Sequence, residues 1–525
     1  MTIRAEKRTR CFSTIRKRHL TTGSVPEKLS NGSADTYLRC KHSGIKNVPA
    51  MLFSILRNRK YFQNLSHMMM EERETRRDTM NRFVKGIILL SIAAFFAECL
   101  EFVVNMILAR ELGEHGMGLY MSILPTIFLI IVIASLELPI SISKFIAESN
   151  QKLHESMLRH AFRMTAVFTA FSTAAASIAL PFIPVFDTYH PFIKGIVIGL
   201  IPVVAFTSIA RGYFMGVQQM GKIAVANVMK KIIQVLCLFI FFQWYSFEID
   251  MAVLISLFVL VASDVVVFVY LYTQFILARR ALSGHQHIHL RGKDVRKRLL
   301  AVSIPTTGLR IFHAVTNAIE PFLVKGALLA SGAAGTAAID QYGMLAGVAM
   351  TIGSFPAFIA HSLMVVMIPS ISEAYALSQY DIVLKRLRQA IFITFGYGIP
   401  AVWVMFQFAG PLTHLFFQSP EAQYYLQLLW PFFLFHLFVM PLQACLIGIG
   451  HVKTAFYHNV WSSIVGLSMM YVLGSMPELQ MLGIILGMNT GMILLTSLHY
   501  ATICKDLGVS VFLTGGGRTA PRIES

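Results

Sequence analysis

The stretch SIPTTGLRIFHAVTNAIEPFLVK, residues 303–325, is the part of the chain that best indicates both fold class and function. It is apolar enough to cross a bilayer, yet it carries Arg310, His313, Asn317 and Glu320. Their spacing of 3, 4 and 3 residues places all four within about 80° of arc on a helix that turns 100° per residue. At 1.5 Å of rise per residue, Arg310 and Glu320 lie about 15 Å apart along that face.

This polar face has a functional and a structural interpretation. A charged side chain at the centre of a bilayer costs at least about 2.5 kcal/mol on insertion scales, so it normally faces water or a partner. Four polar residues on one face exceed what a single ion pair requires, which favours one wall of a solvated pathway. The alternative is an internal ion pair that locks two helices together.

The overall composition is that of a helical membrane protein. The chain has 525 residues, of which 55% are hydrophobic and only 14% charged, and its mean hydropathy is +0.62. A soluble protein carries charge on about a quarter of its residues. The six cysteines are scattered without a CxxC motif, and no GxxxxGK[ST] motif occurs. We therefore expect no disulfide framework, no metal, no cofactor and no direct use of ATP.

The first 79 residues differ from the rest, with 17 Lys or Arg against 7 acidic residues and no long apolar run. We interpret residues 1–80 as a basic tail that is either disordered or an extension preceding a start near Met80. Without residues 1–79 the formal charge falls from +18 to +8, from 28 basic and 20 acidic residues. No base-stacking motif accompanies the charge, so it does not indicate a nucleic-acid partner.

From Met80 onward the apolar runs predict about twelve transmembrane helices. They lie near residues 84–109, 117–140, 161–184, 192–214, 227–246, 251–278, 299–328, 342–370, 389–410, 423–449, 455–476 and 479–502. Basic and acidic connections alternate, and one basic connection is expected to hold Arg211, Lys222, Lys230 and Lys231. The positive-inside rule then places both termini of this multi-pass protein in the cytoplasm.

Three pairs of similar segments divide the twelve helices into two halves. GVQQMGKIAVANV (216–228) matches GIGHVKTAFYHNV (448–460), and PISISK (139–144) matches PSISE (369–373). An even number of helices per half gives both halves the same orientation, related by an axis along the membrane normal. We expect six-helix lobes at 81–278 and 299–504, a basic cytoplasmic linker at 279–298 and a cytoplasmic tail at 505–525.

The third pair concerns polar residues. Glu98, Glu101 and Asn105 in the first expected helix repeat the spacing of Arg310, His313 and Asn317 in the seventh. If the halves are equivalent, these two helices face each other across the axis. Their charges then either hold the resting state together or form an ion pair that breaks and reforms during transport. We expect the other polar residues at membrane depth to serve packing or local hydrogen bonding: Glu137, Asp264, His361 and His436.

Three segments resemble a known family. GEHGMGLYMSILPTIFLIIVIASLELPISISKFIAE (113–148), YGMLAGVAMTIGSFPAFIAHSLMVVMIPSISEA (342–374) and SIPTTGLR (303–310) resemble conserved blocks of stage V sporulation protein B-type exporters. These belong to the multidrug/oligosaccharidyl-lipid/polysaccharide (MOP) superfamily, as do lipid II flippases and multidrug-and-toxin extruders (MATE proteins). The resemblance, over about residues 81–500, implies two six-helix lobes around a central cavity, a bacterial plasma membrane, and a role in cell-wall or spore-cortex polysaccharide export.

Two features depart from the lipid II flippases. Those proteins line their first helix with arginines and carry two further carboxy-terminal helices, whereas this chain has Glu98 and Glu101 and about twelve helices. These departures disfavour lipid II itself as the substrate and leave a related lipid-linked glycan as a candidate.

The sequence thus predicts a non-enzymatic flippase for a lipid-linked oligosaccharide or polysaccharide precursor, working by alternating access. Arg310, His313, Asn317 and Asn105 are the expected substrate ligands, with Arg310 gripping phosphate. Glu98, Glu101 and Glu320 are the expected gating or ion-coupling carboxylates, with H⁺ or Na⁺ and membrane lipids as further partners. The alternatives are a cation-coupled multidrug antiporter and a non-transporting component of spore-envelope polysaccharide synthesis.

Overall fold

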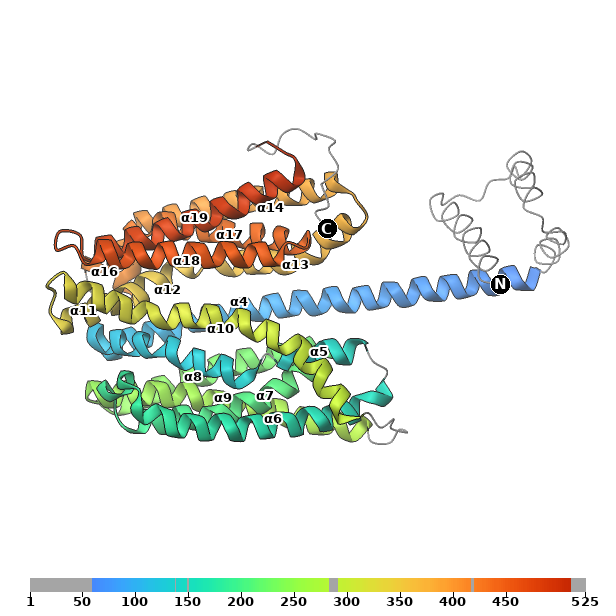
Figure 1. The fold of residues 1–525 in the computed structure, drawn as a ribbon, viewed down its shortest axis with the longest axis horizontal. Helices are drawn as coiled ribbons and strands as arrows, with labels where there is room; N and C mark the ends of the chain where they lie inside the picture. The colour runs from blue at the N-terminus through green and yellow to red at the C-terminus, as the bar shows by residue number, and fades with distance from the viewer. Residues whose placement is uncertain (1–58, 137, 149–150, 283–290, 417–419, 511–525) are drawn as a thin grey trace. The chain divides into compact units, whose positions relative to one another are not determined.

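The computed structural model describes residues 59–136, 138–148, 151–282, 291–416 and 420–510, and every regular element in these ranges is helical (Figure 1). The predicted all-α class is thereby confirmed. The chain divides into two compact units, Met1–Arg82 and Phe83–Ser525, and the second contains the bundle discussed below. Most of the expected tail, residues 1–58, lies outside the described residues, as do 283–290 of the expected linker and 511–525 of the carboxy-terminal tail.

The elements follow one another in two similar series. The first series comprises α4 (Arg59–Ser135), α5 (Leu138–Glu148), α6 (Gln151–Ala179), η1 (Leu180–Phe182), η2 (Pro184–Thr188), α7 (Phe192–Gly216), α8 (Met220–Trp244) and α9 (Ile249–Leu282). The second comprises α10 (Gly292–Ala330), α11 (Gly335–Tyr342), η3 (Gly343–Ala349), α12 (Met350–Ser354), α13 (Ala357–Ala376), α14 (Tyr380–Gln407), α15 (Ala409–His414), α16 (Pro420–Leu428), α17 (Trp430–Gly448), α18 (Val452–Gly474) and α19 (Met481–Leu507).

Nine helical runs among the described residues are long and apolar enough to cross a membrane. One of them, Ile92–Ala147, is 56 residues long, whereas a single crossing needs about 20. It breaks at Gly113, whose φ of 64° and ψ of −174° are not helical, between the first two expected helices. The 39-residue α10 is not among the nine. The protein is therefore a multi-pass membrane protein, and the count of twelve stays a prediction.

The repeat predicted from the sequence is also visible in the helix boundaries. A constant difference of 232 relates the end of α7 at 216 to that of α17 at 448, and the starts of α8 and α9 at 220 and 249 to those of α18 and α19 at 452 and 481. The packing repeats as well, because α5 contacts α7 and α7 contacts α9, just as α13 contacts α17 and α17 contacts α19.

The matched motifs 216–228 and 448–460 form the same turn between two helices. Gln218 and Gly450 occupy the left-handed region, with φ of 58° and 91°. The next residue in each turn, Gln219 or His451, donates its backbone N–H to the carbonyl of Phe214 or Leu446, at 2.9 and 2.8 Å. This αL turn satisfies the last carbonyls of one helix and starts the next one within three residues.

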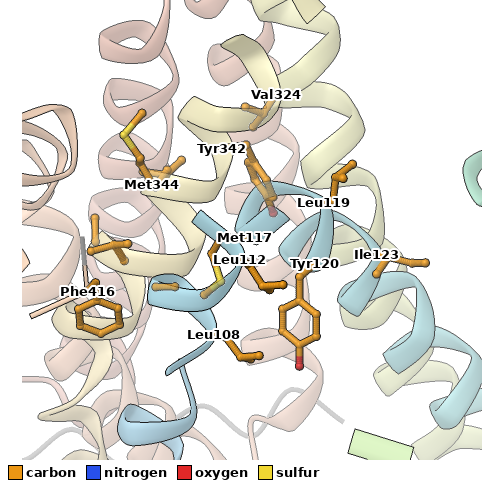
Figure 2. Packing of buried hydrophobic residues seen from close by; sticks show 14 of the residues in the cluster. Leu108, Leu112, Met117, Leu119, Tyr120, Ile123, Val324, Tyr342, Met344 and Phe416 are labelled. Atoms are coloured by element: carbon orange, nitrogen blue, oxygen red, sulfur yellow. The ribbon is translucent and has the colours of Figure 1, made fainter. Parts of the chain in front are cut away.

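Among the described residues, the apolar side chains form one core common to both lobes, one separate core in each lobe, and a small fourth cluster around Ala360. The common cluster, called the shared core, joins first-lobe residues such as Leu108 and Ile123 to second-lobe residues such as Tyr342 and Phe416 (Figure 2). A first-lobe core surrounds residues such as Ile142 and Leu271, and a second-lobe core surrounds residues such as Ile371 and Leu446. The lobes are therefore joined at one end of their helices, and each has its own core towards the other end.

Candidate functional site

The predicted polar face of α10 is accessible along most of its length. Arg310, His313 and Asn317 are exposed, and Glu320, which is half-buried, lies one turn before Val324 of the shared core. Residues at the end of a helix are often exposed for trivial reasons, but these residues lie in the middle of α10, so their exposure is informative. It places three of the four predicted α10 residues on an accessible surface.

A second exposed face of α10 is entirely apolar. Ile304, Ile319 and Phe322 are 62%, 47% and 39% exposed. At 100° per residue, this face points about 180° away from Arg310, His313 and Asn317. Apolar side chains that are exposed in a membrane protein meet lipid, so the polar face opposite them meets a different surrounding. This separation favours the solvated-pathway interpretation over a helix that is merely locked to its neighbours.

The position of α10 explains how its middle remains accessible. Val295 and Leu299, near its start, belong to the first-lobe core, whereas Val324 and Leu328 belong to the shared core. Ser303 donates a hydrogen bond to the carbonyl oxygen of Leu136, where the chain turns from α4 into α5. Further along, α10 packs on α18 and α11 of the second series. The helix thus passes from one lobe to the other, and the polar face lies on the part between its two anchors.

The corresponding polar residues of α4 have a partner inside their own lobe. Glu98 is exposed, while Glu101 and Asn105 are partly buried. Glu101 forms an ion pair with Lys231 of α8, and the two side chains are 40% and 21% exposed. Glu98 is repelled by Glu101 and attracted by Lys231 and by His361 of α13. The expected pairing of this face with Arg310 and His313 stays a prediction.

Four charged residues of α7, α8 and α9 were assigned to other roles in the sequence. Arg211, Lys230 and Lys231 were grouped with a basic cytoplasmic connection, whereas the structure places them inside α7 and α8, which are joined through residues 217–219. Asp264 of α9, expected to serve packing or local hydrogen bonding, accepts a 2.7 Å hydrogen bond from Lys230 Nζ of α8. Arg211 Nη2 donates to Asn227 Oδ1 at 3.1 Å, which links α7 to α8.

The internal repeat held a signal for where α8 begins. The motif match aligns Asn227 with Asn459, and Asn459 lies inside the eleventh expected helix. Carrying that boundary, residue 455, back by the constant difference of 232 starts the fifth helix near residue 223, closer to the observed start at 220 than the expected 227.

The charged residues Lys230, Lys231 and Asp264 have neutral counterparts in the second lobe. With the same difference of 232, Lys230, Lys231 and Asp264 correspond to Ser462, Ser463 and Thr496 of the second lobe. Thr496 donates to the carbonyls of Phe435 and Met492, and Ser462 to that of Asn459, so neutral hydroxyls take these places. Nearby in the second lobe, His458 and His499 approach within 3.2 Å. Among the described residues, no group of three or more His, Cys, Asp or Glu is arranged to hold a metal ion.

Comparison with known proteins places this geometry in a family. Residues 83–375 match the model of the polysaccharide biosynthesis protein family, and residues 331–472 match that of the MatE family. The chain is 93% identical over 445 residues to sporulation protein YkvU of Bacillus subtilis (strain 168), covering 85% of this chain and 100% of that protein. It is 31% identical over 445 residues to stage V sporulation protein B of the same organism, covering 82% and 85%.

Two solved structures share the fold at low sequence identity. A multidrug resistance MATE transporter of the MOP superfamily, in its inward-facing conformation, superposes with a TM-score of 0.63 at 16% identity, covering 77% of this chain and 93% of that one. The lipid II flippase MurJ, in an inward closed conformation, gives 0.61 at 12% identity, covering 79% and 87%. The chain therefore belongs to the polysaccharide biosynthesis protein family, is homologous to stage V sporulation protein B, and has the fold of the MOP superfamily.

Proposed function

We propose that the protein is a MOP-type flippase that moves a lipid-linked oligosaccharide, or another cell-wall or spore-cortex polysaccharide precursor, across the bacterial plasma membrane. The observation that carries this proposal is the exposed polar face of α10, set opposite a separate exposed apolar face. A flippase needs both surroundings, because the sugar-phosphate head group travels through water while its lipid tail stays in the bilayer. Membership of a polysaccharide biosynthesis family supports the choice of substrate class.

Alternating access follows from the distribution of the cores. The ends of α5, α9 and α14, which lie beside the two separate cores, carry basic residues such as Lys144, Arg279 and Lys385. The positive-inside rule assigns this end to the cytoplasm, together with both chain termini. The shared core then closes the outer end. In this arrangement the head group enters from the cytoplasmic side, and breakage of the contacts between the lobes at the shared core releases it outside.

The residues on the two polar faces take distinct roles in this mechanism. Arg310, with His313 beside it, binds the anionic phosphate through charge-assisted hydrogen bonds, and Asn317 and Asn105 bind sugar hydroxyls. Glu98, Glu101 and Glu320 serve gating or coupling to H⁺ or Na⁺. A membrane potential of 100 mV supplies about 2.3 kcal/mol per charge moved, which is enough to bias the conformational change without ATP.

The test is substitution of Arg310 in purified protein reconstituted into liposomes. A fluorescent lipid-linked pyrophosphoryl sugar in the inner leaflet, protected from an outside quencher, reports movement between leaflets. Arg310→Ala and Arg310→Lys should both abolish movement, since lysine keeps the charge but lacks the planar fork that matches phosphate oxygens. Arg159→Lys is the matched control, because Arg159 is 50% exposed in an ion pair on α6, and it should move the probe at the wild-type rate. A well-inserted Arg310→Ala protein that moves the probe normally would refute the assignment.

A second candidate function is a cation-coupled multidrug antiporter. The MatE match over residues 331–472 and the acidic face with Glu98 and Glu101 favour it. The liposome assay separates the two candidates. Efflux of a cationic dye driven by a Na⁺ or H⁺ gradient, with no movement of the lipid-linked probe, would establish the antiporter.

A further inference from the structure

We propose that Lys231 is a second phosphate ligand, supplied by the first lobe, and that Glu101 holds its ammonium group until a phosphate or pyrophosphate group displaces the carboxylate. This inference rests on the proposed function and adds a residue, and an exchange of partners, to the same pathway. It starts from the ion pair that joins α4 to α8.

The two adjacent lysines of α8 differ in what surrounds their partners. Lys230 reaches Asp264, whose side chain is 17% exposed, whereas Lys231 reaches Glu101, whose side chain is 40% exposed. Adjacent residues of a helix point about 100° apart, so one lysine faces α9 and the other faces α4. The two lysine side chains are equally exposed, at 22% for Lys230 and 21% for Lys231, so the difference lies in the carboxylates. Asp264 is the less exposed of the two, whereas Glu101 belongs to the α4 polar face that carries Glu98 and Asn105.

The repeat shows that the fold does not require a charge at this position. Ser463 stands in the second lobe where Lys231 stands in the first, and α17, α18 and α19 pack together there in the same way as α7, α8 and α9. Bringing two charges into a membrane interior carries a desolvation cost that a neutral pair avoids. Because the fold does not require this charged pair, we attribute the pair to a role in binding.

That chemistry is competition between anions. Two carboxylates, Glu98 and Glu101, act on the one ammonium group, and they repel each other. A phosphate group carries up to about two negative charges and three acceptor oxygens, against one charge on a carboxylate. It therefore competes for Lys231 more strongly than Glu101 does. With Lys231 on the first lobe and Arg310 on α10, the head group has a cation on each side, and its arrival releases Glu101.

The test uses the two partners of this ion pair. Binding of the fluorescent lipid-linked pyrophosphoryl sugar to protein in nanodiscs is measured for Lys231→Met and Glu101→Gln. Lys231→Met should weaken binding by about tenfold or more, as expected for loss of a hydrogen bond to a charged group. Glu101→Gln should tighten it by about threefold to tenfold, because the competitor has lost its charge. Opposite directions are expected only if the carboxylate and the ligand exchange at one site.

Lys230→Met and Asp264→Asn are the matched controls. Their carboxylate is less exposed than that of Glu101 and lies on α9, away from the α4 polar face, so both variants should lower thermal stability and neither should tighten binding. If Glu101→Gln behaves like them, with lower stability and unchanged or weaker binding, the pair is structural and the inference fails. Should Lys231→Met not fold, Glu101→Gln alone still decides the question.

Competitors identify the source of the phosphate group and separate this inference from the proposed function. Inorganic pyrophosphate should displace the probe from wild-type protein and lose that ability in Lys231→Met. Displacement by phosphatidylglycerol alone would assign Lys231 to a bilayer lipid and overturn the inference. If the wild type does not bind the lipid-linked probe but binds pyrophosphate through Lys231, the proposed substrate is wrong and the inferred phosphate site is supported. If wild type and Lys231→Met bind the probe equally, only the inference fails.

Discussion

His115 Nδ1 lies 2.7 Å from Asp340 Oδ1 and joins α4, just beyond its break at Gly113, to α11. Both side chains are about one third exposed, at 34% and 33%. The contact connects the two lobes beside the shared core. The backbones are also very close here, because a Cβ on Gly118 would collide with the carbonyl oxygen of Ile339. In the proposed mechanism this contact closes the outer end and must separate in each transport cycle.

A disulfide between positions 115 and 340 is expected to stop transport. With the six native cysteines replaced, His115→Cys and Asp340→Cys should be oxidised together, and movement of the liposome probe should cease until a reductant is added. The matched control is Asp187→Cys with Lys194→Cys. These residues are ion-paired at 2.9 Å within the first lobe alone, so a disulfide there should leave transport intact. Undiminished transport by the fully oxidised 115–340 protein would show that this contact does not open.

Gly118→Ala should shift the protein towards the state that is open at the outer end. The added methyl group cannot be accommodated against Ile339, and overpacking of this kind costs about 1–3 kcal/mol. Reactivity of a cysteine at position 340 with a membrane-impermeant reagent should rise accordingly. Gly199→Ala is the control, because a Cβ at Gly199 of α7 meets no atom within 4 Å. Equal reactivity in both variants would contradict a tight contact at Gly118.

Helical class, the approximate helix positions and the polar faces could be predicted from sequence because each depends on local periodicity. The spacing of Arg310, His313 and Asn317 fixes a common face whatever the helix packs against. The Glu101–Lys231 ion pair could not be predicted in this way, because it depends on how α4 packs against α8. The position of the break near Gly113 was anticipated to within a few residues, whereas the start of α8 differed by seven, from 227 to 220.

Glu155 is expected to stabilise the half of the first lobe that contains the first-lobe core. Its side chain is only 7% exposed and receives hydrogen bonds from Arg279 Nε and Nη2, the shortest at 2.6 Å, which ties α6 to α9. Glu155→Gln removes the charge that matches this fork, and loss of such charge-assisted bonds costs about 1–3 kcal/mol. The apparent melting temperature in detergent should fall, and the variant should transport the same probe as the wild type.

Arg159→Ala provides the comparison for Glu155→Gln. Arg159 is 50% exposed and lies 3.7 Å from the same carboxylate in an i,i+4 arrangement, where such pairs contribute only about 0.3–0.5 kcal/mol. Its melting temperature should stay close to that of the wild type. If both variants lowered the melting temperature by similar amounts, the hydrogen bonds from Arg279 would contribute no more stability than the exposed ion pair of Arg159.

The assignment of sides is tested by cysteine labelling in intact cells. Single cysteines replace Asp187, Glu248 or Glu478 at connections assigned to the outside, and Arg291 or Lys385 at those assigned to the cytoplasm. All five native side chains are exposed, so access to the reagent depends on the membrane and not on burial. An impermeant maleimide should react with the first three in intact cells, and with the last two only after the membrane is permeabilised.

Labelling of Arg291→Cys from outside would invert the whole assignment. The two separate cores would then face outward, the shared core would close the cytoplasmic end, and Arg310 would receive its ligand from the external leaflet. That orientation would contradict the proposed entry route, because a precursor made in the cytoplasm must enter from the cytoplasmic side. Protection of positions 291 and 385 together with reactivity at 187, 248 and 478 supports entry from the cytoplasm, since all five positions then agree with one orientation of the bundle.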